Sequence, residues 1–174
     1  MKNIFTDMEL KVIKKYNSPE KVQEFLLKEI EYDDKDTIYS FRKVVKDKKA
    51  HCLEGALTAA TILEQYGYPP LILDFHSPDG LDHVLYLYKK DGKYGAIGKS
   101  RCPRRMERKP RYKTVEDLIS TYYKPYMDRP NARIKSYAIV DLRKLKVNWR
   151  TSEKNLWAVN NYLLKIRHKK FSPK

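Results

Sequence analysis

Cysteine thiols are the strongest nucleophiles among ordinary side chains, and this sequence of 174 residues contains two of them, Cys52 and Cys102. Cys52 begins the stretch CLEGALTAATILEQYG, in which apolar residues recur at helical spacing. The first turn of a helix presents unpaired backbone N–H groups and the positive end of the helix dipole, which favour a thiolate over a thiol. His83 stands 31 residues further on, just before VLYLY, and could accept the thiol proton. The sequence therefore predicts a pair in which Cys52 is the nucleophile and His83 the base.

Each of these residues also has a purely structural interpretation. A free cysteine is often a small buried residue, and a histidine in a strand often serves packing. The order of elements favours the reactive pair, because a cysteine at a helix start is followed by a histidine at a strand start. His51 could be a solvated neighbour or could help to polarise the thiol, and we expect it to be solvated. We expect Glu54 to interact with the helix dipole. We expect His76 and Asp79 to shape the rim of the site.

The elements that must position this pair follow from periodicity and capping. Helices are predicted where apolar residues recur at intervals of three and four, and strands where β-branched and aromatic residues cluster. An Asp-Gly turn joins two of the strands into a hairpin. The predicted helices cover residues 18–30, 37–45, 52–66, 114–127 and 152–168, and the predicted strands cover 71–75, 83–88, 94–98 and 136–142. The predicted class is α+β, with a helix that carries Cys52 at its start packed on an antiparallel sheet.

The stretches HCLEGALTAATILEQYGYPPLILDF and DHVLYLYKKDGKYGAIGKS, within about residues 45–100, resemble the core of the transglutaminase-like superfamily. The resemblance implies a papain-like fold, with Cys52 as the nucleophile that accepts an acyl group and His83 as its base. That family carries a third residue, an aspartate, on the strand after the histidine. Here the corresponding stretch, AIGKS, contains neither Asp nor Asn. Ser100 or a backbone carbonyl could orient the imidazole instead, as could Asp82 or Asp74.

A second feature is the strongly basic C-terminal half of the chain. Residues 1–98 contain 15 Lys and Arg against 16 Asp and Glu, whereas residues 99–174 contain 22 against 6. The densest stretch is KSRCPRRMERKPRYK, and aromatic residues are interleaved with cations further on, a pattern typical of nucleic-acid binding. We expect a basic loop beside the site whose charges contribute little to stability. The candidate polyanion-binding residues are Lys99, Arg101, Arg104, Arg105, Arg108, Lys109, Arg111 and Lys113.

Length and composition predict a single domain over residues 1–174, with its core at about 45–100 and a basic extension at 99–174. Two cysteines are too few for a disulfide framework, and the chain has no apolar stretch long enough to span a membrane, so we expect a cytoplasmic protein that does not bind membranes. The potential zinc ligands near the site have no standard spacing, so we expect no metal and no other cofactor. Those four ligands are His51, Cys52, His83 and Cys102.

Two functions from different classes follow from these features. The first is a cysteine-dependent hydrolase or acyltransferase that acts on an amide or acyl bond, with a peptide or protein as its substrate. The second is a non-catalytic binding module that keeps the transglutaminase-like fold and holds nucleic acid or an acidic partner through its basic half. The Cys52 and His83 pair favours the enzyme, and the missing aspartate favours the binding module.

Overall fold

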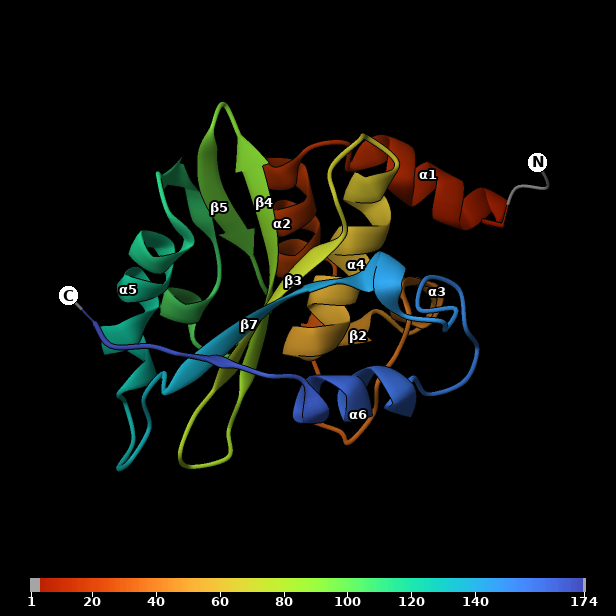
Figure 1. Cartoon of the computed structure of the whole chain (residues 1–174). Coiled ribbons are helices and arrows are strands. Elements are labelled where there is room, and N and C mark those ends of the chain that lie inside the picture. Colours follow the sequence, from red (N-terminus) through yellow and green to blue (C-terminus); the bar gives the residue numbers. More distant parts are fainter. Residues whose placement is uncertain (1–3, 174) are drawn as a thin grey trace.

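The computed structural model describes residues 4–173 and shows an α+β fold built on a six-stranded antiparallel sheet (Figure 1). The strand order is β6-β5-β4-β3-β7-β8. Asp91 and Gly92, both with positive φ, form the tight turn between β4 and β5, as the Asp-Gly signal predicts. The strands are β3 (Leu71–His76), β4 (His83–Lys90), β5 (Lys93–Ile97), β6 (Arg108–Tyr112), β7 (Ser136–Asp141) and β8 (Lys169–Lys170). A separate parallel pair joins β1 (Glu31–Tyr32) and β2 (Lys49–Ala50).

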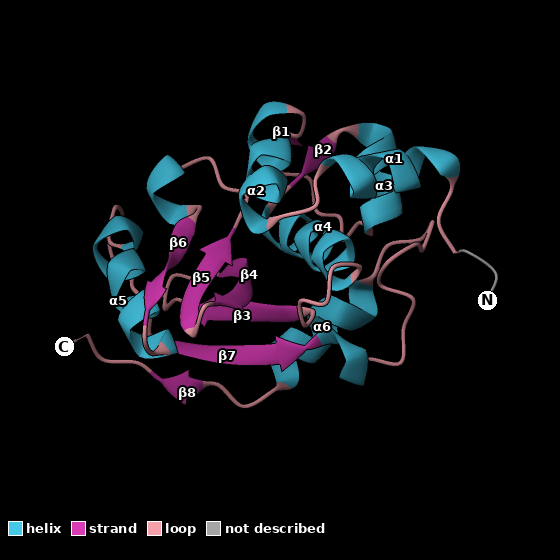
Figure 2. Ribbon diagram, turned by 90° about the horizontal axis from the view of Figure 1, so that it is seen from above, coloured by secondary structure: helices cyan, strands magenta, loops and turns pink. Residues whose placement is uncertain are grey.

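Helices cover both faces of the sheet (Figure 2). Successive side chains of a strand point to opposite faces, so Ile72 joins the core formed with the N-terminal helices, and Leu73 joins the core formed with α5. The first core also includes α6. The helices are α1 (Asp7–Lys15), α2 (Pro19–Lys28), α3 (Phe41–Asp47), α4 (Cys52–Glu64), α5 (Val115–Tyr126) and α6 (Trp157–Lys165).

Several predicted elements have different limits in the structure. The helix expected at 37–45 begins only at Phe41, because Ser40 caps it through a hydrogen bond from the backbone of Lys43. The closing helix expected at 152–168 is shorter, since α6 covers only Trp157–Lys165. The stretch expected as a basic loop contains a short 3₁₀ helix, η1 (Pro103–Arg105), and the edge strand β6.

The central helix α4 is buried along almost its whole length, and its start is fixed by Glu54. One carboxylate oxygen of Glu54 accepts a hydrogen bond from the backbone N–H of His51 (3.0 Å). The other accepts from the Thr37 hydroxyl (2.7 Å) and from the Tyr39 backbone (2.8 Å). Glu54, which was expected to interact with the helix dipole, therefore also anchors the segment before α3 to the start of α4, where Cys52 lies.

The segment that follows β5 is held against α2 and α4. The buried Gln23 side chain donates to the Gly98 carbonyl and accepts from the Gly98 N–H, both at 3.0 Å. The buried Lys99 ammonium donates to the carbonyls of Leu26 (2.7 Å) and Ile30 (2.5 Å) at the end of α2. Gly55 allows this close approach, because a Cβ atom there would lie 2.7 Å from the Cβ of Lys99. These contacts place residues 98–102 beside the start of α4.

Within residues 4–173, no helix is both long and apolar enough to cross a membrane.

Candidate active site

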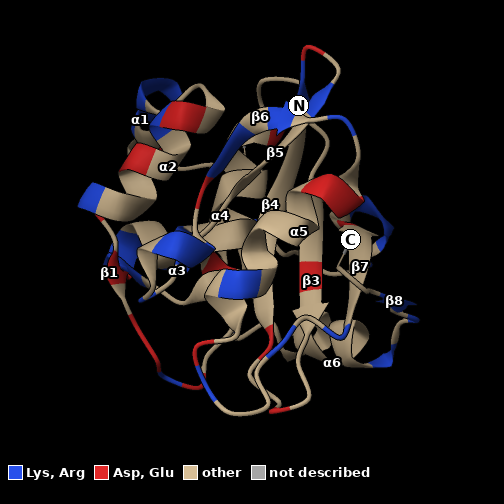
Figure 3. Ribbon diagram, turned by 90° about the vertical axis from the view of Figure 1, so that its left-hand side faces the viewer, with Lys and Arg blue, Asp and Glu red and all other residues tan. Residues whose placement is uncertain are grey.

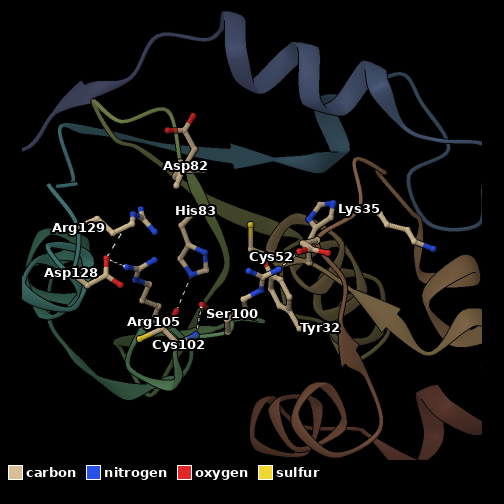
Figure 4. A pocket seen from close by; sticks show the side chains of 14 residues that line it. Tyr32, Lys35, Cys52, Asp82, His83, Ser100, Cys102, Arg105, Asp128 and Arg129 are labelled. Atoms are coloured by element: carbon tan, nitrogen blue, oxygen red, sulfur yellow. Dashed lines mark hydrogen bonds and ion pairs between the residues drawn. The ribbon is translucent and has the colours of Figure 1, made fainter. Parts of the chain in front are cut away.

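Cys52 is the first residue of α4 and opens on a cavity of about 550 Å³ (Figure 4). Besides the start of α4, four parts of the chain that are distant in the sequence line the cavity. The end of β1 and the segment after it form one side, the residues around the start of β4 another, and the segments around η1 and after α5 complete it. The lining residues are Tyr32, Asp34, Lys35, His51, Cys52, Leu81, Asp82, His83, Ser100, Arg101, Cys102, Arg105, Asp128 and Arg129.

His83 is the first residue of β4, and its buried side chain contacts Cys52, so the structure brings the two residues of the predicted pair together. Its Nε2 lies 2.9 Å from the backbone carbonyl of Arg105. A carbonyl only accepts hydrogen bonds, so Nε2 carries the proton and Nδ1 is left to face the thiol. The carbonyl of Arg105 thus fixes the tautomer and the orientation of the His83 ring.

The sequence left Ser100, Asp82, Asp74 and a backbone carbonyl as candidates for the group that orients the His83 ring. The backbone carbonyl of Arg105 is the one that contacts the ring. The Ser100 hydroxyl lines the cavity but accepts a hydrogen bond from the backbone of Cys102 (3.1 Å). Asp82 also lines the cavity and accepts from the backbone of Ser77 (2.9 Å). Asp74 is buried on β3 and bonds to His168.

His51, which we expected to be solvated, is mostly buried and contacts Cys52 from the other side. Its Nε2 donates to the Thr37 carbonyl (2.5 Å) and lies 3.4 Å from a carboxylate oxygen of Glu54. Burial lowers the pKa of His51, but its hydrogen bond with Cys52 and the charge of Glu54 outweigh burial and raise the pKa to about 9. His51 is therefore a protonated neighbour of the thiol at neutral pH.

The environment of Cys52 favours the thiolate. Burial alone would raise the pKa of the thiol, since it penalises the charged form. Hydrogen bonds from His51 and His83 and the charges of both rings outweigh burial and lower the pKa to about 5. A thiolate held between two imidazoles at a helix start is a nucleophile that is ready at neutral pH.

The arginines of this cavity are paired with acids. Arg101 pairs with Asp34 and lies over the Tyr32 ring, which links the two sides of the cavity mouth. Arg105 is mostly buried and pairs with Asp128. Arg129 donates to Asp79 (3.0 Å), so Asp79 acts at the rim through this ion pair. The cavity lining carries four Lys and Arg and three Asp, so it is close to neutral.

Three of the eight candidate polyanion-binding residues are engaged in the fold. The ammonium of Lys99 is bonded to carbonyls of the α2 segment, and Arg105 is paired inside the cavity. The guanidinium of Arg108 lies over the Tyr122 ring, 4.0 Å from its centroid, and donates to the Thr121 hydroxyl (2.8 Å). The expectation that the charges of this stretch contribute little to stability is therefore wrong for these three. The five exposed cations are Arg101, Arg104, Lys109, Arg111 and Lys113.

Sequence reasoning favoured a solvated His51 over one that polarises the thiol, although a signal for its contact with Glu54 was present. A histidine directly before a helix, with a glutamate three residues later, is the spacing at which the glutamate contacts the cap residue. His76, expected at the rim, lines a smaller cavity of about 140 Å³ that also touches Cys52.

No model of a known protein family matches this sequence, and no curated protein matches it either.

Proposed function

We propose that this protein is a cysteine-dependent enzyme of the transglutaminase-like type, with a papain-like core, that cleaves or transfers an acyl group at an amide bond. The observation that carries the proposal is the Cys52 thiol at the start of α4 between two imidazoles, with a pKa lowered to about 5. The resemblance of residues 45–100 to that superfamily supports it as well. The cavity of about 550 Å³ gives a substrate room beside the thiol.

In this mechanism the Cys52 thiolate attacks the carbonyl carbon of an amide and forms a tetrahedral intermediate. Backbone N–H groups of the first turn of α4 stabilise the negative oxygen. Protonated His83 then donates its Nδ1 proton to the departing amine, the C–N bond breaks, and a thioester remains on Cys52. Water or a second amine, deprotonated by His83, attacks the thioester and restores the free thiol.

His83 and His51 have different roles in this proposal. His83 lines the cavity at the start of a strand, and its proton can reach the leaving group. The Nε2 of His51 is turned toward the Thr37 carbonyl and Glu54, which suits a fixed positive charge. His51 is therefore a positioning residue that stabilises the thiolate, and His83 is the general acid and base.

The test is alkylation of the native protein by iodoacetamide at pH 6, followed by mapping of the modified cysteine. A pKa of about 5 makes the Cys52 thiolate roughly 300 times more abundant at pH 6 than a free thiol with a pKa of ~8.5. The Cys52 thiolate is also less basic than a free thiolate, which reduces its intrinsic nucleophilicity by about 25- to 50-fold. The two effects together lead us to expect that Cys52 reacts about tenfold faster in the native protein than in the urea-unfolded chain. Equal rates in the native and unfolded protein would refute the proposal, and Cys102 serves as the internal reference.

A second function, polyanion binding, is favoured by the edge strand β6. Burial alternates along this strand, so Lys109 and Arg111 are exposed on one side of it, and Lys113 follows two residues later. Figure 3 shows blue Lys and Arg positions along β6. An edge strand leaves this row of cations open to a partner along one margin of the sheet. We propose that nucleic acid or another polyanion binds there, alone or as part of the substrate of the enzyme.

Changing Lys109, Arg111 and Lys113 together to Glu is expected to weaken binding to single-stranded DNA and to heparin. Loss of three phosphate contacts should reduce the slope of log affinity against log salt by about 2. The matched control changes Lys11, Lys14 and Lys46, which are exposed on α1 and α3, to Glu and alters the net charge equally. If both triple variants lose binding to the same extent, the interaction reflects net charge alone and β6 is not the binding surface.

A further inference from the structure

Beside Cys52, a second cluster of titratable side chains takes no part in the proposed reaction. Asp74 and His76 come from β3, Asp82 from the loop before β4, and His168 from the segment between α6 and β8. One oxygen of Asp74 lies 2.9 Å from Nε2 of His168 and 3.8 Å from Nε2 of His76. Donor atoms of Asp74, His76 and His168 all lie within 4.8 Å of one another. Two segments distant in the sequence, β3 and the chain before β8, therefore converge on one point.

The hydrogen bonds of His168 fix the orientation of its ring. Its Nδ1 lies 3.1 Å from the carbonyl of Ile166, which can only accept, so Nδ1 carries a proton. Nε2 is the ring nitrogen that faces the carboxylate oxygen of Asp74, 2.9 Å away. A proton bridges two such groups at this separation, and a metal ion that binds here would displace it. A histidine whose other nitrogen donates to a backbone carbonyl is also the usual arrangement of a metal ligand.

The charges of the cluster also favour a bound cation. The side chains of Asp74 and His168 are only 3% and 5% exposed. Asp82 brings a second carboxylate, 3.5 Å from Nε2 of His76. Among residues 4–173, the ion pairs of both carboxylates are formed with histidines and not with Lys or Arg. The buried Asp74 carboxylate and the more exposed Asp82 carboxylate together present negative charge that a divalent cation would balance.

We propose that Asp74, His76 and His168 form a binding site for a divalent transition-metal ion of the zinc class. Imidazole and carboxylate donors suit such ions, and bonds of about 2.1 Å in a tetrahedron place neighbouring donors about 3.4 Å apart. The Asp74 oxygen lies 2.9 Å from Nε2 of His168 and 3.8 Å from Nε2 of His76, one separation below this value and one above it. The rings of His76 and His168 are stacked with centroids 3.6 Å apart, so His76 must tilt to direct its lone pair at the same ion. Its side chain is 28% exposed, which leaves room for that movement.

The cluster borders the cavity of about 140 Å³ that Asp74, His76 and Cys52 line together, and this cavity would give an ion access to the site. The ion would connect β3 with the chain just before β8, between residues 94 positions apart in the sequence. An ion that binds only the folded chain stabilises it, so binding should raise the thermal midpoint. The proposal is independent of the catalytic role of Cys52.

The experiment titrates tag-free protein, first dialysed against a chelator, with ZnCl₂ in a calorimeter. A Cys52→Ala background removes the thiol as a competing ligand. We expect one Zn²⁺ per chain and a higher thermal midpoint when zinc is present. Changing His76 to Ala, or Asp74 to the isosteric Asn, should weaken binding at least tenfold, and the Asn variant keeps the shape of the buried site if the Ala variant fails to fold.

His83→Ala in the same background is the matched control, because it removes a nearby histidine that lies outside the cluster. It should bind Zn²⁺ as tightly as its parent. Lack of saturable binding, unchanged affinity in both cluster variants, or loss of binding in the His83 control would each overturn the proposal.

Discussion

Replacing His83 with alanine is expected to raise the pKa of the Cys52 thiol from about 5 and to remove most of its reactivity at pH 6. The reason is that burial of Cys52 persists while one of its two stabilising hydrogen bonds is lost. Each unit by which the pKa rises reduces the thiolate at pH 6 by up to tenfold. The ultraviolet absorbance of the thiolate, followed against pH in a Cys102→Ala background, reports the pKa directly.

His51→Ala is the informative companion variant. His51 also donates to the thiolate, so its loss should raise the same pKa. The His83 ring, held by the Arg105 carbonyl, should remain in place to act as acid and base. We therefore expect His51→Ala to shift the pH profile of acyl transfer to higher pH and to retain turnover above the new pKa. His83→Ala should lose turnover at every pH, and equal losses in both variants at high pH would contradict the division of roles.

Changing Gly55 to alanine is expected to destabilise the protein by about 1–3 kcal/mol, the usual range for overpacking a core. The new Cβ would lie 2.7 Å from the Cβ of Lys99, and Lys99 cannot easily move because its ammonium is bonded to two carbonyls. Thermal or urea unfolding measures the effect, with a shift of roughly 2–4 °C for each kcal/mol.

The sign of the Gly55 effect makes this test decisive. In an unobstructed helix, Gly to Ala stabilises by up to about 1 kcal/mol, because alanine has the higher helix propensity. A more stable Gly55→Ala protein would mean that residues 98–102 do not lie against α4 as described. We also expect slower alkylation of Cys52 in this variant, since Lys99 adjoins Ser100, which lines the cavity.

The sequence allowed the α+β class and the main elements of the fold to be predicted, because their signals are local. Ser18 and Pro19 mark the start of α2, and the Asp-Gly turn marks the β4 and β5 hairpin. The α1 helix was not predicted, although Thr6 caps it and Glu9 completes the capping box. Strand β6 was read as a loop, since its cations alternate with residues that are only partly buried.

The candidate site was predictable only where the residue type itself carries the chemistry. Cys52 and His83 were identified because a thiol at a helix start and an imidazole at a strand start are visible in the sequence. The partner of His83 is a backbone carbonyl at Arg105, which no residue type reveals. The cluster around Asp74 depends on His168, 94 positions away, and this contact exists only once β7 and β8 extend the sheet.

The most direct test of the central claim is acyl transfer to Cys52 from p-nitrophenyl acetate. On rapid mixing at neutral pH, we expect a burst of one equivalent of p-nitrophenolate per chain, and peptide mass spectrometry should locate one acetyl group on Cys52. Cys52→Ala should show no burst, and His83→Ala should show a much slower one. If the wild-type protein gives no burst, or if the burst persists in Cys52→Ala, Cys52 is not an acyl-accepting nucleophile and the proposed enzyme function is wrong.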